Sequence, residues 1–237
     1  MSAPFVFLPG WCLGRGPLAA TVAALDGQFF DLPGYGTAPL TGDFDAAADA
    51  IAARLTQGTT LAGWSLGGQL ALAVAARAPD KVGKLVLVAS TASFVQRDGW
   101  PQAMPPEMLA EFIAAVTADV EAMLPRFVGG FNRGDARSKE VTRAILDLAD
   151  PRPPAATLAA GLAWLRDVDL RDVAPRVRTP TLLLHGAADP LMPLPAATAL
   201  TALIPGARLE TFTGCAHAPF ISQPADFLAR LRAFVHD

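Results

Sequence analysis

The chain has 237 residues, which fits one domain with a single core and leaves little room for a second complete domain. Hydrophobic residues make up 52% of the chain and charged residues 17%, a composition that supports a large buried core and excludes a disordered protein. The formal net charge of −3 provides no general attraction to nucleic acid, so we expect no nucleic-acid partner.

The first 93 residues alternate short apolar runs with longer helical patterns, which is typical of a parallel sheet flanked by helices. Strands are predicted at residues 5–8, 28–31, 59–62 and 84–88. Helices are predicted at residues 43–57 and 65–77, the first with Asp43 as its N-cap and Gly58 just past its end.

The region from residue 94 to residue 169 breaks this alternation, because it contains no convincing strand. A helix is predicted at 107–124 from an apolar stripe at spacings of four, four, four and three: Met108, Phe112, Val116, Val120 and Met123. A second helix is predicted at 136–149, with Asp135 as its N-cap and an inner face of Val141, Ile145 and Leu148. Such an insertion predicts a cap over the carboxyl edge of the sheet, where open α/β folds bind ligands.

After this insertion the strand pattern returns, with strands predicted at 181–185 and 209–212 and a final amphipathic helix at 227–235. The predicted fold class is therefore α/β, with a mostly parallel sheet flanked by helices. We expect residues 1–93 and 170–237 to form the core, and residues 94–169 to form a helical cap that is not an independent domain.

The motif that carries chemistry is Gly63-Trp64-Ser65-Leu66-Gly67, which matches G-x-S-x-G between a predicted strand and a predicted helix. In this context the motif is a nucleophile elbow, a turn so tight that the residues two before and two after the serine must be small. The hydroxyl of Ser65 is thereby exposed at the top of the sheet. An isolated G-x-S-x-G is weak evidence, but its position between a strand and a helix makes a nucleophile the favoured interpretation.

A serine nucleophile needs a base, and the chain has three histidines. His236 lies next to the C-terminus, where fraying is expected. His185 ends a predicted strand, and we interpret it as a hydrogen-bonded structural residue. His217 lies in the loop between the last strand and the last helix, where an α/β-hydrolase fold places its base, so we predict it as the catalytic base.

The acid that orients the histidine must follow a late strand. Asp189 does so, just past the strand at 181–185, although an Asp-Pro turn is the simpler interpretation of the same residues. Asp31 also follows a strand, but it precedes the serine in the chain and is read as structural. The predicted triad is therefore Ser65, Asp189 and His217.

An oxyanion hole is predicted from two backbone N–H groups. One belongs to Leu66, directly after the nucleophile, and the other to Trp11 in the loop after the first strand. Gly10 lets that backbone approach closely. The indole of Trp11 is a candidate wall of the acyl pocket, or else a packing anchor.

Several motifs together resemble one family, the pimeloyl-[acyl-carrier protein] methyl ester esterases of biotin synthesis, within the α/β-hydrolase superfamily. They are Gly10-Trp11, Asp31-Leu32-Pro33-Gly34-Tyr35-Gly36, Gly63-Trp64-Ser65-Leu66-Gly67-Gly68, Val88-Ala89-Ser90, Trp100-Pro101, Val168-Asp169-Leu170-Arg171 and His217-Ala218-Pro219-Phe220-Ile221-Ser222. The resemblance covers nearly the whole chain. It implies an α/β-hydrolase fold and hydrolysis of the methyl ester of a pimeloyl chain on acyl carrier protein, with release of methanol.

The resemblance also implies binding residues. Substrate contacts are expected at Trp11, Ser65, Leu66, Phe127, Val128, Gly129, Gly130, Phe131 and His217. Carrier-protein docking is expected at Arg126, Arg137, Lys139 and Arg143.

The charge pattern of the cap bears on this docking. Residues 126–143 hold five basic side chains against two acidic ones. Lys139 and Arg143 lie one turn apart, each about 200° around the helix from Val141, so they should face solvent. Such a face suits an acidic carrier, but an ordinary solvated helix face explains it equally well.

Two other classes of function stay open. One is a general carboxylesterase or lactonase that acts on small free esters without a carrier. The other is a non-catalytic α/β-hydrolase relative that serves as a binding module, against which the intact triad argues. The sequence implies no cofactor and no metal site.

The chain lacks a secretory signal pattern, and no run approaches the roughly 18 apolar residues that a membrane span needs. We therefore expect a cytoplasmic monomer without a membrane partner. Cys12 and Cys215 are far apart in sequence, so we interpret them as packing residues and not as a disulfide or a metal pair.

Overall fold

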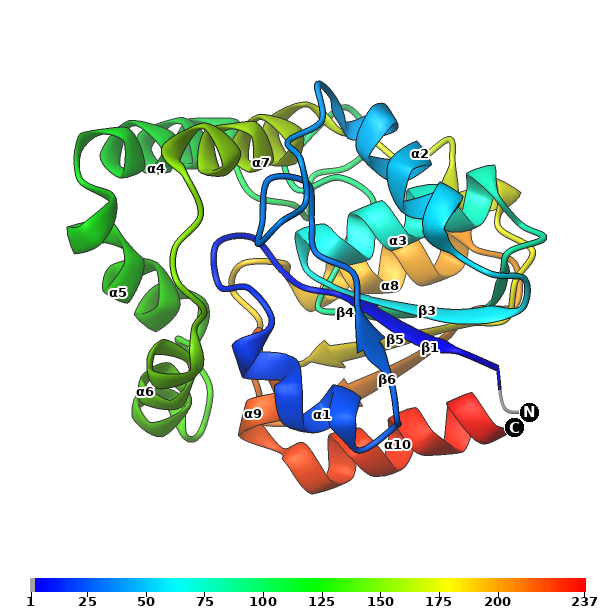
Figure 1. Ribbon diagram of the computed structural model, residues 1–237. Coiled ribbons are helices and arrows are strands. Elements are labelled where there is room, and N and C mark those ends of the chain that lie inside the picture. Colours follow the sequence, from blue (N-terminus) through cyan, green and yellow to red (C-terminus); the bar gives the residue numbers. More distant parts are fainter. Residues whose placement is uncertain (1–2) are drawn as a thin grey trace.

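Six parallel strands form the centre of the molecule in the order β2-β1-β3-β4-β5-β6 (Figure 1). The computed structural model describes residues 3–237. The strands are β1 (Phe5–Leu8), β2 (Gln28–Phe29), β3 (Thr59–Trp64), β4 (Val82–Val88), β5 (Thr181–Gly186) and β6 (Arg208–Phe212). All six predicted strands are confirmed, and β2 is two residues shorter than expected.

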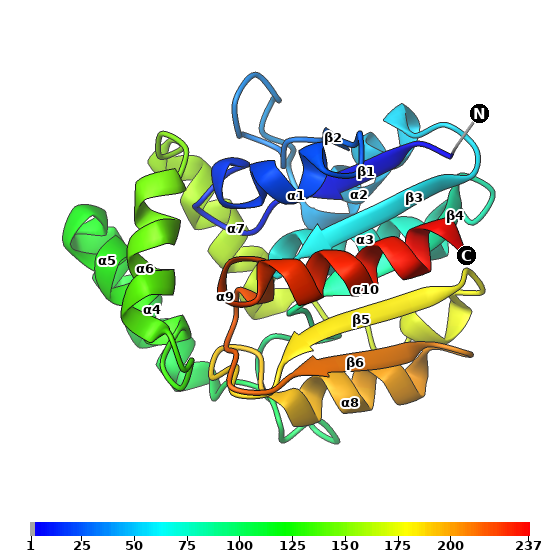
Figure 2. The same cartoon turned by 90° about the horizontal axis from the view of Figure 1, so that it is seen from below.

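Helices cover both faces of this sheet, as the consecutive apolar positions of its strands require. On one face lie α2 (Phe44–Arg54), α3 (Leu66–Arg77) and α8 (Leu194–Leu203). On the other lie α1 (Ala19–Ala23) and α10 (Pro224–His236), with the short α9 (Pro219–Ser222) at the end of α10 (Figure 2). Short 3₁₀ turns occur at Gly16–Leu18 and Ala174–Arg176. Asp43 caps α2 as predicted, because its Oδ1 accepts the N–H of Ala46 at 2.7 Å.

The core divides into two layers, one on each side of the sheet. Successive strand residues point to opposite faces, so Leu85 packs in one layer and Val86 in the other. The same alternation places Leu183 and Leu184 in different layers. Both cysteines are buried and free, as predicted, and burial raises the pKa of each thiol to about 12.

Four helices lie between β4 and β5 and form a cap at the carboxyl edge of the sheet (Figure 1). They are α4 (Pro106–Ala118), α5 (Val120–Phe131), α6 (Ser138–Leu148) and α7 (Ala155–Asp167). Ser93 and Asp169 form an antiparallel bridge at the base of this insertion. The cap limits of 94 and 169 stay a prediction. No helix among residues 3–237 is long and apolar enough to cross a membrane.

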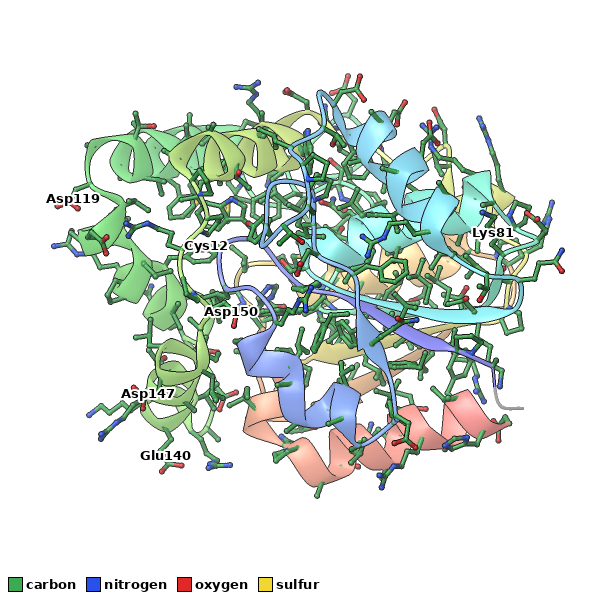
Figure 3. All side chains as sticks on the ribbon, in the orientation of Figure 1. Cys12, Lys81, Asp119, Glu140, Asp147 and Asp150 are labelled. Carbon is green, nitrogen blue, oxygen red and sulfur yellow. The ribbon has the colours of Figure 1, made fainter. Side chains whose placement is uncertain are left out.

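The prediction of one continuous helix at 107–124 is wrong. The helix is interrupted at Asp119, which has an extended backbone (φ −158°, ψ 90°) and lies at the turn between α4 and α5 (Figure 3). Its carboxylate accepts the N–H of Ala122 at 3.0 Å, so Asp119 is the N-cap of a new helix. The apolar spacing continues across the break, which is why periodicity alone did not reveal it.

The prediction of Asp135 as the N-cap of the second cap helix is also wrong. Helix α6 begins at Ser138, and Arg137 occupies the N-cap position without a capping side chain. The carboxylate of Asp135 instead accepts the N–H of Arg137 at 2.7 Å and that of Ala216 at 3.0 Å. The second of these partners is 81 residues away in the chain.

Candidate active site

Ser65 lies at the turn between β3 and α3, in a backbone conformation that is rare for a side-chain-bearing residue (φ 58°, ψ −120°). The turn is held by the Ser65 N–H, which donates to Val88 O at 2.9 Å. A Cβ on Gly63 would collide with the carbonyl of Gly67, and a Cβ on Gly67 would collide with the carbonyl of Pro9. The two glycines are therefore required by close backbone contact, as the motif predicts.

His217 follows β6 in a tight loop and is buried, with 1% of its surface exposed. Its Nδ1 lies 2.7 Å from Oδ2 of Asp189. Because a carboxylate only accepts hydrogen bonds, Nδ1 carries the proton and Nε2 is left as an acceptor. The carbonyl of His217 accepts the indole N–H of Trp64 at 3.0 Å, which ties the loop to the residue before Ser65.

Both carboxylate oxygens of Asp189 accept hydrogen bonds. While Oδ2 contacts the histidine, Oδ1 accepts the N–H groups of Leu191 and Met192, each at 2.9 Å. His185, at the end of β5, supports the same loop because its Nε2 donates to Met192 O at 2.6 Å. Burial lowers the pKa of His185, which disfavours the charged form of the ring.

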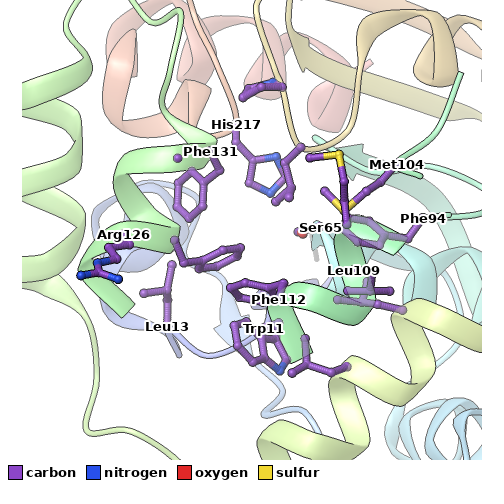
Figure 4. Close-up of a pocket in the computed structure, with 18 of the residues that line it drawn as sticks. Trp11, Leu13, Ser65, Phe94, Met104, Leu109, Phe112, Arg126, Phe131 and His217 are labelled. Carbon is purple, nitrogen blue, oxygen red and sulfur yellow. The ribbon is translucent and has the colours of Figure 1, made fainter. Parts of the chain in front are cut away.

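Ser65 and His217 line one cavity of about 320 Å³, which lies between the sheet and the cap (Figure 4). Its walls are mainly apolar and aromatic: Gly10, Trp11, Leu13, Trp64, Phe94, Met104, Met108, Leu109, Phe112, Met123, Phe127, Gly130, Phe131, Leu162, Leu165, Pro190 and Leu191. Arg126 and Arg133 add two cations to the lining. The cavity therefore suits a mainly apolar chain that presents a polar group to Ser65.

The cap residues expected to bind substrate divide between two faces of α5. Phe127, Gly130 and Phe131 line the cavity, and the Phe131 ring lies 5.1 Å from the ring of His217. Val128 is fully buried on the other face, where it packs in the core layer with Phe7, and Gly129 is not among the cavity-lining residues that the structure describes. This division follows from the 100° rotation per residue of a helix.

Trp11 lines the cavity with its indole, whose Nε1 donates to Leu158 O at 3.0 Å. The loop that carries Trp11 is held by the hydroxyl of Tyr35, which accepts the N–H of Cys12 at 2.8 Å. Leu66 is the first residue of α3, and the first N–H groups of a helix have no partner within that helix. The side chain of Leu66 packs in the core and not in the cavity.

The predicted docking residues differ in their surroundings. Arg126 lines the cavity at the edge of the view farthest from Ser65 (Figure 4). Arg137 pairs with Glu140 at 2.8 Å and also donates to Ser222 O at 3.1 Å. Arg143 pairs with Asp147 at 3.6 Å, and Lys139 is exposed. Glu140 and Asp147 thus reduce the positive charge of this face (Figure 3).

Sequence reasoning missed part of the cavity wall. Arg133 was counted only as a basic residue, and α7, which contributes Leu162 and Leu165, was not predicted. The spacing of Met108, Phe112 and Met123 was a signal, because it marked an apolar stripe that turned out to face the cavity. Asp31, read as structural, pairs with Arg15.

Comparisons with known proteins show the family of the chain. A model of the alpha/beta hydrolase family matches residues 5–231. The chain is 40% identical to the pimeloyl-[acyl-carrier protein] methyl ester esterase of Aromatoleum aromaticum, covering 93% of each chain. It is 38% identical to the enzyme of the same name from Nitrosomonas europaea, over 94% of this chain and 92% of that one.

Solved structures are similar as well. An esterase from Exiguobacterium antarcticum superimposes with a TM-score of 0.88 at 28% identity, over 100% of this chain and 93% of that one. An enol-lactonase from Burkholderia xenovorans superimposes with a TM-score of 0.84, but at 19% identity it supports the fold alone. By its fold and its relatives, the chain is a carboxylic ester hydrolase that belongs to the pimeloyl-[acyl-carrier protein] methyl ester esterase family of α/β-hydrolases.

Proposed function

We propose that the protein hydrolyses the methyl ester of a pimeloyl chain carried on acyl carrier protein, with Ser65 as nucleophile, His217 as base and Asp189 as the orienting acid. The observation that carries this proposal is the buried contact of 2.7 Å between His217 Nδ1 and Asp189 Oδ2, on a histidine that lines the same cavity as Ser65. Curated relatives at 38–40% identity supply the substrate class.

In the first half of the reaction, Nε2 of His217 removes the proton of the Ser65 hydroxyl as its oxygen attacks the ester carbonyl. The N–H groups of Trp11 and Leu66 stabilise the resulting oxyanion, and each such donor contributes about 3–4 kcal/mol. Asp189 stabilises the imidazolium of His217. The intermediate collapses when His217 returns its proton to the methoxy group, which leaves as methanol.

In the second half, water replaces methanol. His217 takes a proton from the water as the water oxygen attacks the acyl-Ser65 carbonyl, and it then returns the proton to the serine oxygen. The products are a free carboxylate and regenerated enzyme. The apolar wall of the cavity holds the methylene chain, and the uncharged methyl ester needs no ionic partner for binding.

Docking of an acidic carrier is proposed at Arg126, Arg137, Lys139 and Arg143. Arg126 is exposed and lines the cavity, and Lys139 and Arg143 are exposed on α6. Long-range attraction by such a face raises the rate of encounter with an acidic partner.

A second candidate is a carboxylesterase that acts on free esters. The pairing of Arg137 with Glu140 and of Arg143 with Asp147 favours it, because both cations already have local partners. The likeness to the esterase from Exiguobacterium antarcticum at 28% identity is consistent with either candidate.

The two candidates differ in their response to the carrier. If the proposal is correct, kcat/KM for methyl pimeloyl-acyl carrier protein exceeds that for free dimethyl pimelate by at least about 10-fold, and charge reversal at Arg126, Lys139 and Arg143 abolishes this preference. The protein should also restore growth to a biotin auxotroph that lacks its own esterase. Equal kcat/KM for both substrates, with no complementation, would favour the second candidate.

A further inference from the structure

A short segment of the cap, residues 134–137 between α5 and α6, is hydrogen-bonded to the loop that carries the predicted base. The N–H of Ala136 donates to Gly214 O at 2.8 Å. The guanidinium of Arg137 donates to Ser222 O at 3.1 Å, just after the same loop. The cap is therefore attached to the core at the loop of His217, and not only through the chain connections at its base.

The same segment also contacts the loop that carries the predicted acid. Gly134 has a positive φ of 93°, and a Cβ placed on it would lie 3.2 Å from the Cβ of Ala188. Ala188 directly precedes Asp189, and its N–H donates to Cys215 O at 2.9 Å. The segment thus lies against the point where the acid loop and the base loop join.

Asp135 makes the central contact of this segment. Its carboxylate is buried, with 7% of the residue exposed. Oδ2 accepts the N–H of Ala216 at 3.0 Å, and Oδ1 accepts the N–H of Arg137 at 2.7 Å. One oxygen therefore organises the cap turn, and the other reaches across to the residue before His217.

The main chain around His217 is consequently fixed from two sides. On the cap side, Asp135 holds the N–H of Ala216, and on the sheet side the indole of Trp64 holds the carbonyl of His217. Ala216 is fully buried, so loss of the carboxylate would leave its N–H without a partner in a place closed to bulk water. The loop would relieve that cost by shifting, and the imidazole would move with it.

We propose that Asp135 is a positioning residue: it acts through Ala216 to hold His217 in its reactive position, and so couples the cap to the catalytic base. The inference rests on the roles proposed above for Ser65, His217 and Asp189. It assigns to the cap a part in catalysis as well as in substrate binding. A displacement of about 1 Å at a reacting group costs on the order of 100-fold in rate, so a single hydrogen bond to this loop has a measurable effect.

The test compares Asp135→Ala and Asp135→Asn with Asp147→Ala, a matched change of an exposed carboxylate on the same cap. The substrate is p-nitrophenyl butyrate, which needs no carrier. We expect Asp135→Ala to lower kcat by about 100-fold with KM within about 2-fold of wild type. Asp135→Asn retains one acceptor oxygen and should lower kcat by about 10-fold. The kcat of Asp147→Ala should equal that of wild type.

Active sites are counted with a fluorophosphonate, which labels Ser65 only in folded enzyme, so that kcat refers to intact molecules. The rate constant of this labelling should fall in parallel with kcat, because it depends on the same base. If Asp135→Ala folds poorly, Asp135→Asn provides the same comparison. Wild-type kcat per labelled site in both variants would overturn the inference.

The outcome is separable from that of the proposed substrate. An enzyme that hydrolyses p-nitrophenyl butyrate but not methyl pimeloyl-acyl carrier protein would remove the substrate proposal and leave the role of Asp135 intact. Wild-type kcat per labelled site in Asp135→Ala would remove that role and leave the substrate proposal intact.

Discussion

The core and the cap of this protein differ in how they are built and in what they contribute. In the core, residues that follow β3, β5 and β6 bring Ser65, Asp189 and His217 to one edge of a sheet that is buried on both faces. The cap helices bury one side only, and they add an apolar wall with two cations. The proposed reactive groups thus lie in turns and loops anchored at the ends of buried strands, whereas the shape of the cavity depends on the more exposed part.

The contact through Asp135 qualifies this division, because it links the cap directly to the base loop. The cavity wall and the positioning of His217 are therefore not independent. Changes in the core should act mainly on turnover or stability, changes in the cap wall should act on substrate binding, and a change at Asp135 should act on turnover from within the cap.

The largest effect that sharpens this comparison is expected at Asp189. Asp189→Asn removes the charge that orients and stabilises His217 and should lower kcat by about 10⁴-fold. The matched control is Asp31→Asn, which changes another carboxylate after a strand, one that pairs with Arg15 outside the cavity. Steady-state kinetics on a p-nitrophenyl ester measure both, and equal activity of the two variants would contradict the assigned acid.

A second prediction compares one apolar residue from each region. Leu85→Ala, which truncates a fully buried side chain of β4, should lower the free energy of unfolding by about 2–5 kcal/mol. Met108→Ala, whose side chain lines the cavity but is 54% exposed, should change it by less than about 0.5 kcal/mol and should raise KM for long-chain esters. Urea unfolding and kinetics on esters of increasing chain length measure the two effects. The reverse pattern would show that the cap is part of the cooperative core.

A smaller effect concerns pH and the buried His185. Burial lowers its pKa in the folded state, so below its ordinary pKa of about 6.5 the unfolded chain binds a proton that the folded chain does not. Stability from this group is therefore complete above about pH 6.5 and falls as the pH decreases, by at most about 1.4 kcal/mol per pH unit.

His185→Gln should be less stable than wild type at pH 8, but it should lose less stability between pH 7 and pH 5. The control is His236→Gln at the exposed C-terminal end. Urea unfolding at the three pH values gives the comparison. Parallel loss of stability in wild type and His185→Gln would mean that His185 does not contribute to the acid sensitivity.

The two regions also differ in how well the sequence predicts them. Core strands are continuous apolar runs, so they could be located from local patterns. The serine motif between a strand and a helix indicates a nucleophile elbow, and the order of the triad then located the loops of Asp189 and His217. Helix α8 was missed because Leu194–Leu203 is rich in small apolar residues and lacks a polar face. Helix α7 was missed for a similar reason.

In the cap, local patterns were misleading in two places. Asp119 starts a new helix within an apolar spacing that continues unbroken, and Asp135 has the sequence context of an N-cap although it bonds to Ala216, far away in the chain. The contact of Asp135 with Ala216 is tertiary and cannot be read from the nearby residues, whereas the cap by Asp119 is local and was hidden by the continuous apolar spacing. The sequence also could not predict that Arg133 lines the cavity, because this depends on how the cap folds back over the sheet.

The central claim is that the acyl group of the ester is transferred to Ser65, with loss of the alcohol, before water releases it as the free acid. Its most direct test is to quench the enzyme with acid during turnover of methyl pimeloyl-acyl carrier protein or p-nitrophenyl butyrate, and to locate the acyl group by peptide mass spectrometry. We predict an acyl adduct on the peptide that contains Ser65, and neither adduct nor measurable hydrolysis in Ser65→Ala. Hydrolysis near the wild-type rate by Ser65→Ala, or an adduct on another side chain, would contradict the account.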